Sequence, residues 1–263
     1  MISDIKIGIT GLPGAGKTTA LLRVIDMLKA ECDKLDVKPD FYSYHMYGNE
    51  LDTPKYLGNA PREYLDKIGW TETETILNEW HFIRAWSGVH SNITEESYRR
   101  SVEGKDGLMG INSAAFNIAT FCIWQNSKLD YAYYYGCGVG SWGITYPSTR
   151  WNKNYYSLLM MRDMVYDFPN KVAVSGGGDT QRALAAVSDD GKQAAVLIGD
   201  LYGSCMDIPV EIKGFGFAST VTCTILDDAH ENAVVECKPD KNGLYHLKKS
   251  EPGSAAFMLI LKK

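Results

Sequence analysis

TILNEW at residues 75–80 and DFYSYHMY at residues 40–47 are two short, largely apolar runs that contain a few polar side chains. Similar runs occur as IKIGIT at 5–10 and DYAYYY at 130–135. Apolar residues at helical spacing follow them near 17–32, 61–68, 112–126 and 153–166. A regular alternation of strands and helices is typical of βα units with a parallel sheet. We therefore expect an α/β fold with about four such units.

The pattern changes near residue 169. From there the chain consists of short β-rich runs separated by turn residues, and Asp190-Gly191 and Asn242-Gly243 are strong hairpin signals. Regular turn spacing of this kind is typical of a small antiparallel β-sandwich. We therefore expect two domains, an α/β domain over 1–168 and a β-sandwich over 169–263.

The composition excludes several kinds of partner. The net charge of −5 and the lack of a basic cluster argue against nucleic acid and anionic membranes. No segment is long enough to span a membrane, and the first residues do not resemble a signal peptide, so the chain as written is expected in the cytoplasm. The cysteines show neither C-x-x-C pairs nor a metal-ligand spacing, so we expect reduced, mostly buried thiols and no metal site. They are Cys32, Cys122, Cys137, Cys205, Cys223 and Cys237.

GLPGAGKTT at 11–19 is the most specific short motif in the chain. It satisfies the phosphate-binding pattern G-x-x-x-x-G-K-[ST], and a strand-loop-helix pattern over 5–32 surrounds it. In such a loop, backbone N–H groups bind the phosphates of ATP or GTP, the lysine reaches the outer phosphates and the threonine binds Mg²⁺. The residues would be Gly11, Gly14, Gly16, Lys17 and Thr18. A glycine-rich βα turn of another α/β protein is the competing interpretation.

A nucleotide hydrolase also needs an acidic residue at the end of a second strand, to hold Mg²⁺. The nearest match is Asp200 in AAVLIGD, but this run lies in the β-rich tail. We therefore interpret Asp200 as part of a sandwich strand, which leaves the phosphate-binding motif without its partners.

Polar side chains gather where two of the predicted strands end. His45 and Tyr47 end the run at 40–47, and Asn78 and Glu79 are near the end of the run at 75–80. The carboxyl ends of parallel strands meet at one edge of the sheet. A carboxylate beside a tyrosine and a histidine can act as a nucleophile or a base.

Several longer segments, taken in order, resemble one family. DFYSYHMYGN, YLDKIGWTETETILNEWH, AAFNIATFCIWQNSKLDYAYYY…SWGITY and the tail ALAAVSDDGKQAAVLIGDLYG…PGSAAFMLILKK resemble the C-terminal part of a clan A glycoside hydrolase. Family 39, the β-xylosidase and α-L-iduronidase group, is the most similar. The resemblance covers roughly residues 34–263. It implies a partial (β/α) barrel over 1–168, followed by the β-sandwich.

The resemblance also implies roles for individual residues. Glu79 matches the nucleophile at the end of the seventh barrel strand, and His45, Tyr47 and Asn78 match the sugar-binding subsite. Trp142 could stack on a sugar, or it could be a packed loop aromatic. The implied reaction is retaining hydrolysis of an O-glycosyl bond in a xyloside- or uronide-type carbohydrate, without a cofactor.

One part of the family pattern is missing. The acid/base of this clan follows an asparagine on the fourth barrel strand, and that strand would lie upstream of residue 1. We therefore expect a truncated protein with little or no glycosidase activity of its own, whose parent could be secreted through an upstream signal peptide. Barrel strands without their neighbours leave sheet edges uncovered, which favours self-association.

Two questions stay open at this point. Residues 1–33 are either a true nucleotide-binding segment joined to a glycosidase fragment, or the fifth strand, loop and helix of the barrel. For the function, Mg-dependent ATP or GTP binding is the alternative to the glycosidase interpretation. A non-catalytic carbohydrate-binding or purely structural fragment is a third hypothesis.

Overall fold

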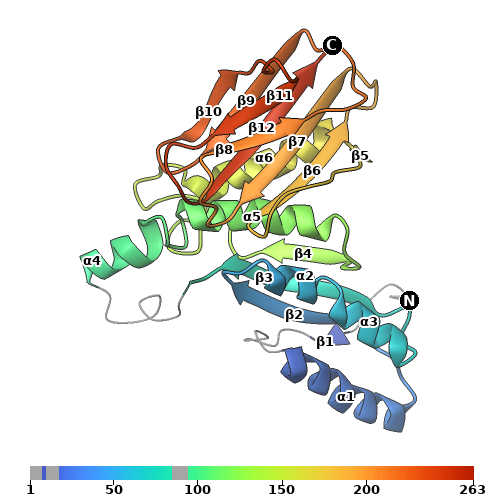
Figure 1. Ribbon diagram of the computed structural model, residues 1–263. Helices are drawn as coiled ribbons and strands as arrows, with labels where there is room; N and C mark the ends of the chain where they lie inside the picture. Colours follow the sequence, from blue (N-terminus) through green and yellow to red (C-terminus); the bar gives the residue numbers. More distant parts are fainter. Residues whose placement is uncertain (1–7, 10–17, 85–93) are drawn as a thin grey trace.

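The computed structural model describes residues 8–9, 18–84 and 94–263. Its first part is a parallel sheet in the order β1-β2-β3-β4 (Figure 1). The strands are β1 Gly8–Ile9, β2 Phe41–Gly48, β3 Glu74–Phe82 and β4 Tyr131–Tyr134. The helices are α1 Thr18–Leu35, α2 Asp52–Leu57, α3 Ala60–Lys67, α4 Glu95–Tyr98, α5 Ile111–Trp124 and α6 Lys153–Asp167, and Arg99–Glu103 is a π-helical turn.

Strand β2 shows why the parallel sheet forms. Its side chains alternate between two faces, as in any strand. Tyr42, Tyr44 and Met46 are buried in a core that also contains side chains of α1, α2 and α3. The Tyr44 hydroxyl donates a 2.6 Å hydrogen bond to the Leu57 carbonyl, which satisfies its polar atom in the core. His45 and Tyr47 therefore lie on the opposite face.

Strand β3 contains a bulge at Asn78. Tyr44 pairs with Leu77, but the next residue, His45, pairs with Glu79, so β3 has one residue more than its neighbour. A bulge reverses the alternation of a strand. Leu77 and Trp80 consequently both join the apolar core, and Glu79 lies on the same face as His45.

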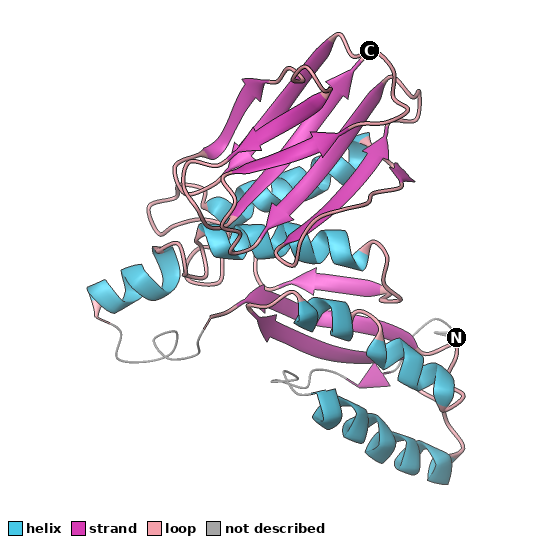
Figure 2. Ribbon diagram, viewed as in Figure 1, coloured by secondary structure: helices cyan, strands magenta, loops and turns pink. Residues whose placement is uncertain are grey.

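The second part consists of two antiparallel sheets (Figure 2). The larger sheet has the order β10-β9-β12-β7-β6-β5, and β8 pairs with β11 in the smaller one. An apolar cluster of side chains from both sheets, with Phe257 and Leu247 among its most buried members, forms the core between them. The strands are β5 Asn170–Val172, β6 Gln181–Val187, β7 Gln193–Asp200, β8 Asp207–Glu211, β9 Thr220–Leu226, β10 Glu231–Glu236, β11 Leu244–Lys248 and β12 Ala255–Lys262.

Helix α5 lies between the parallel sheet and the six-stranded sheet (Figure 1). Together with α6 it covers one face of the larger antiparallel sheet, where Ile118 and Met160 pack in one cluster with Leu197. The approach of α5 to β7 depends on Gly199, because a Cβ atom there would lie 2.5 Å from the backbone nitrogen of Ala119. One apolar core thus joins the two parts of the chain, and the division at residue 168 stays a prediction.

The predicted α/β part with a parallel sheet and the predicted antiparallel tail are both present. The β-rich runs of the tail form the strands β6 to β12. The sequence patterns missed the short β5 and α2, and also the helical residues 95–103. Within the described ranges, no helix is long and apolar enough to cross a membrane.

Candidate active site

Glu79 lies near the carboxyl end of β3, directly beside His45 of β2. Its Oε2 atom accepts a 2.6 Å hydrogen bond from the Tyr47 hydroxyl. The same oxygen lies 3.1 Å from Nδ1 of His45. The side chain of Glu79 remains 31% exposed, whereas that of His45 is 12% exposed. The carboxylate is therefore held in place and still open to a ligand.

The two contacts distinguish the two oxygens of Glu79. Both converge on Oε2, and in the part of the chain that the structure describes no hydrogen bond reaches Oε1. Burial and the hydrogen bond to Glu79 raise the pKa of Tyr47, so its hydroxyl stays protonated and remains a donor. Such an arrangement orients a carboxylate and leaves one oxygen available to attack an electrophile.

Two further aromatic rings pack around Tyr47, the partner of this carboxylate. The ring of Trp142 lies 5.5 Å from that of Tyr47 and 5.8 Å from that of Tyr135, both with edge-to-face geometry. The ring of Tyr135 in turn lies 6.3 Å from that of Tyr47. The structure therefore brings Trp142 next to Tyr47, the hydrogen-bond partner of Glu79, and its role in stacking or packing stays a prediction.

His81, which is not among the predicted site residues, is completely buried beside this aromatic cluster. Its Nδ1 donates to the Phe82 carbonyl at 2.7 Å, so Nε2 accepts from the Tyr134 hydroxyl at 2.7 Å. Burial lowers its pKa from 6.5 to about 4, which keeps the ring neutral. The ring lies 5.2 Å from that of Trp142. The sequence does contain one signal for His81. It lies two residues after Glu79, and alternate residues of a strand share a face, so His81 is expected on the same face as Glu79.

Asn78 occupies the bulge itself. Its Oδ1 atom is buried and, among the described residues, has no hydrogen-bond partner. Bulges of this kind re-aim side chains next to active sites. The predicted residues His45, Tyr47, Asn78, Glu79 and Trp142 therefore lie in one region, although their roles in binding or catalysis stay predictions.

The nucleotide-binding prediction falls mostly outside the described residues. Gly11, Gly14, Gly16 and Lys17 are not described, and Thr18 is the first residue of α1. Asp200, in contrast, ends the antiparallel strand β7, as the sandwich interpretation predicted. Its carboxylate is fully buried and forms a 2.8 Å ion pair with Lys249. Asp200 is therefore a structural residue.

All six cysteines are free, but they are not mostly buried as predicted. Cys137 and Cys205 are exposed and Cys237 is half-buried. Across the described ranges, no group of three or more His, Cys, Asp or Glu side chains could hold a metal ion.

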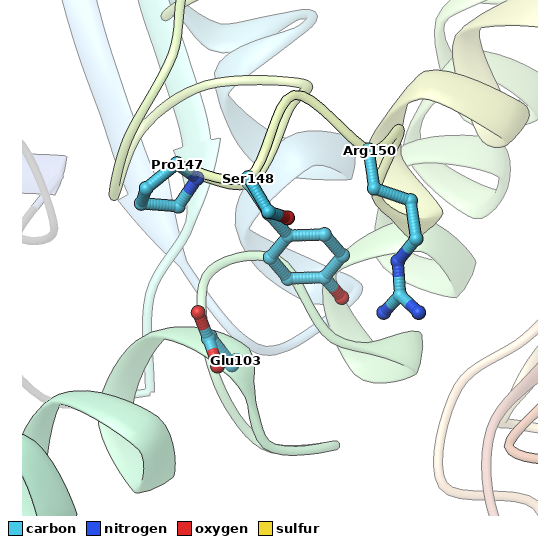
Figure 3. A pocket seen from close by; sticks show the side chains of 5 residues that line it. Glu103, Pro147, Ser148 and Arg150 are labelled. Carbon is cyan, nitrogen blue, oxygen red and sulfur yellow. The ribbon is translucent and has the colours of Figure 1, made fainter.

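A separate pocket of about 420 Å³ lies beside the π-helical turn. Figure 3 shows Glu103 opposite the turn that carries Pro147, Ser148 and Arg150. Tyr146 completes the lining, and the guanidinium of Arg150 lies 5.0 Å from the centre of its ring. Glu79 does not line this pocket, so the pocket is not the candidate active site.

Comparisons with known proteins place the fold. A glucosidase from Croceicoccus marinus is similar over 90% of this chain and 56% of its own, with 16% identity and a TM-score of 0.68. The similarity to a family 44 xyloglucanase from Paenibacillus polymyxa extends over 92% of this chain and 51% of that protein, with 11% identity and a TM-score of 0.56. The similarity to a family 51 α-L-arabinofuranosidase from Thermotoga petrophila RKU-1 extends over 84% of this chain and 52% of that protein, with 11% identity and a TM-score of 0.54.

No known protein-family profile matches the sequence, and no curated protein is significantly similar to it. The structural neighbours are nevertheless glycoside hydrolases, and the chain spans about half of their length. The fold is therefore glycosidase-like, and it fits a partial barrel followed by a β-sandwich. None of these neighbours is described as a nucleotide-binding protein.

Proposed function

We propose that this chain carries the nucleophile side of a retaining glycosidase site, with Glu79 as the nucleophile. The observation that supports this most is the convergence of Tyr47 and His45 on Oε2 of Glu79, which leaves Oε1 available. The position of Glu79 near the carboxyl end of a parallel strand agrees with it, since reactive groups of such sheets gather there.

The chemistry assigned to Glu79 is a displacement at the anomeric carbon of a glycoside. Oε1 of Glu79 forms a bond to this carbon while the bond between the carbon and the leaving oxygen breaks. The electron pair of the broken bond goes to the leaving group. Water then hydrolyses the glycosyl ester and regenerates the carboxylate. Tyr47 donates to Oε2 throughout and so holds the carboxylate in one orientation.

The substrate class follows from the resemblance to family 39, which suggests a xyloside or a uronide. The rings of Trp142, Tyr135 and Tyr47 are suited to contact with a sugar face. The sequence assigns no acid/base to this chain. A substrate whose leaving group departs as a stable anion needs no proton from an acid, and it therefore tests Glu79 alone.

The experiment uses the full chain and a 2-deoxy-2-fluoroxyloside with a dinitrophenolate leaving group. The fluorine slows the hydrolysis of the glycosyl ester, so the covalent intermediate accumulates. We expect intact-protein mass spectrometry to show the addition of one fluoroglycosyl group and peptide mapping to place it on Glu79. The isosteric Glu79→Gln variant is the matched control and should remain unlabelled. Labelling at another residue, or none with xylosides and glucuronides alike, contradicts the proposal.

The alternative function, Mg-dependent binding of ATP or GTP by residues 11–18, is tested in parallel by calorimetric titration. Nucleotide binding that is lost in Lys17→Ala, together with no labelling of Glu79, would reverse the assignment. No structural observation on the described residues favours this alternative.

A further inference from the structure

The pocket beside the π-helical turn is lined by two segments of the α/β part. One lining residue, Glu103, lies in the segment that follows β3 (Figure 3). The other lining residues lie in the segment that follows β4 and are Tyr146, Pro147, Ser148 and Arg150. Segments that follow the carboxyl ends of parallel strands lie at one edge of the sheet. The pocket is therefore at the same edge of the sheet as Glu79.

Two small apolar clusters connect this pocket to the candidate active site. Leu108 packs in one cluster with Tyr47 and Trp142. The next residue, Met109, packs in a second cluster with Tyr146. Trp142 and Tyr146 are four residues apart, so their Cα atoms are separated by at most about 14 Å. The pocket and the surroundings of the proposed nucleophile are therefore neighbours that share one supporting segment.

Hydrogen bonds within the segment after β4 fix the shape of the pocket. The Tyr146 N–H donates to the Arg150 carbonyl at 2.8 Å, and the Thr149 N–H donates to the Tyr146 carbonyl at 2.9 Å. The buried side chain of Asn152 donates to the Gly143 carbonyl at 2.9 Å. The turn that carries Tyr146 and Arg150 is therefore formed before any ligand arrives, which lowers the entropic cost of binding.

The lining combines hydrogen-bond donors and acceptors with apolar surface. Arg150 supplies N–H donors and Glu103 supplies carboxylate acceptors. Burial raises the pKa of Tyr146, so its hydroxyl stays protonated. Pro147 and the ring of Tyr146 are apolar. The volume of about 420 Å³ lies in the range of about 300–1,000 Å³ that is typical of small-molecule sites. These groups suit a ligand that has both hydroxyl groups and C–H surface.

The charges around the pocket favour an uncharged ligand. The guanidinium of Arg150 lies 3.9 Å from the carboxylate of Glu231. Glu103 lies on the opposite side of the pocket from Arg150 (Figure 3). An anionic ligand near Arg150 would therefore meet two carboxylates, and like charges oppose binding. A neutral sugar avoids this repulsion.

We propose that this pocket is a second sugar subsite, which binds an uncharged unit of the same oligosaccharide whose glycosidic bond Glu79 attacks. Arg150 and Glu103 hydrogen-bond the hydroxyl groups of this unit, while Pro147 and the ring of Tyr146 contact its C–H groups. The substrate is accordingly an oligosaccharide and not a single glycoside. This inference rests on the proposed function for its substrate class.

The experiment measures how affinity depends on the length of the sugar chain. Isothermal titration calorimetry is performed with xylobiose and xylotetraose on the full chain. Every protein sample carries Glu79→Gln, so that no glycosyl transfer accompanies binding. We expect xylotetraose to bind at least about tenfold more tightly than xylobiose, as one or two additional hydrogen bonds to charged groups imply.

The variants Arg150→Gln and Tyr146→Phe should remove most of this gain and leave the affinity for xylobiose unchanged. Tyr146→Phe keeps the ring that packs with Met109. Arg162→Gln is the matched control and should keep the gain. Arg162 is 59% exposed, as Arg150 is 66% exposed, but it lies on α6 and does not line the pocket. Thermal unfolding verifies that each variant is folded. If Arg150→Gln or Tyr146→Phe is unfolded, the isosteric Glu103→Gln decides in the same way.

The proposal is overturned if xylotetraose binds no more tightly than xylobiose, or does not bind at all. It is also overturned if the gain in affinity persists in Arg150→Gln and Tyr146→Phe. The labelling of Glu79 by the fluoroxyloside separates these results from a failure of the proposed function. Labelling without a dependence on chain length contradicts the subsite alone. A length dependence that requires Arg150, without labelling of Glu79, contradicts the proposed nucleophile and leaves a carbohydrate-binding site.

Discussion

The hydroxyl of Tyr47 and the carboxylate of Glu79 are joined by a 2.6 Å hydrogen bond, although 32 residues separate them in the chain. The bulge at Asn78 makes this contact possible, because it places Glu79 on the face of β3 that neighbours His45 and Tyr47. The orientation of the proposed nucleophile therefore depends on a backbone irregularity and on a side chain from the next strand.

Replacing Tyr47 by phenylalanine should slow the labelling of Glu79 by the fluoroxyloside. The variant keeps the ring but loses a hydrogen bond to a charged group, which contributes about 1.5–3 kcal/mol, or roughly a 10- to 100-fold change in rate. The measurement is the rate constant of inactivation, followed by mass spectrometry. Tyr135→Phe is the control, since Tyr135 contacts Tyr47 through its ring. Equal rates for both variants would mean that the hydroxyl of Tyr47 does not orient Glu79.

The buried His81 should make the protein less stable in acid. Its pKa is about 4 when folded and 6.5 when exposed, so the unfolded chain binds more protons between these values. The free energy of unfolding should consequently fall as the pH drops from 6.5 toward 4, by up to about 3 kcal/mol. Urea denaturation at several pH values measures this, and His81→Gln should flatten the dependence.

The pKa of His246 is shifted in the opposite direction to that of His81, so a His246 variant is a control for the same urea denaturation experiment. Hydrogen bonds to Asp207 and Asp240 raise its pKa, so its contribution is present at low pH and is lost as the pH rises through the folded pKa. The control His246→Gln lacks this low-pH contribution, so it should be at least as sensitive to acid as the wild type. An unchanged pH dependence in His81→Gln would show that other groups cause it.

Breaking the buried ion pair between Asp200 and Lys249 should destabilise the sandwich strongly. Both side chains are fully buried, and Lys249 also donates to the carbonyls of Gly203 and Gly253. Removing one partner leaves a buried charge uncompensated, at a cost of about 3–5 kcal/mol. Denaturant unfolding of Asp200→Asn, Lys249→Met and the double variant measures the coupling. Additive losses would show that the two side chains stabilise the fold independently.

Adding a methyl group at position 199 should separate α5 from β7. The Cβ of Gly199→Ala would lie 2.5 Å from the Ala119 nitrogen and 2.8 Å from the Ala115 carbonyl oxygen. Overpacking against backbone costs about 1–3 kcal/mol, which should appear as a lower midpoint of unfolding. Gly178→Ala is the matched control, because nothing lies within 4 Å of its added Cβ. A loss shared by both variants would point to chain entropy instead of packing.

Strand periodicity was sufficient to predict the order of the main strands and helices. The alternation in β2 and the turn residues of the tail are local signals, and the elements they predicted are present. The bulge at Asn78 has no such signal, because it follows from the pairing of β3 with both neighbours. Glu79 could therefore be selected from its polar surroundings, but its exact partners could not be derived.

His81 and α5 depend on contacts between segments that lie far apart in the sequence. His81 was missed because its neutral state depends on burial and on Tyr134, 53 residues away. The apolar residues of α5 predicted a helix, but the helix is buried almost all round because it contacts two sheets. Tertiary packing of this kind cannot be inferred from one stretch of sequence.

The position of α5 has a consequence for how this architecture can evolve and be engineered. The connecting residues 169–179 are exposed, but the α/β part and the tail do not have separate cores, since α5 and α6 complete the core of the six-stranded sheet. The tail cannot be exchanged for an unrelated domain at residue 168. Such a graft would remove the sheet on which α5 and α6 pack and would expose their apolar side chains. Any viable recombination must transfer α5, α6 and the tail together.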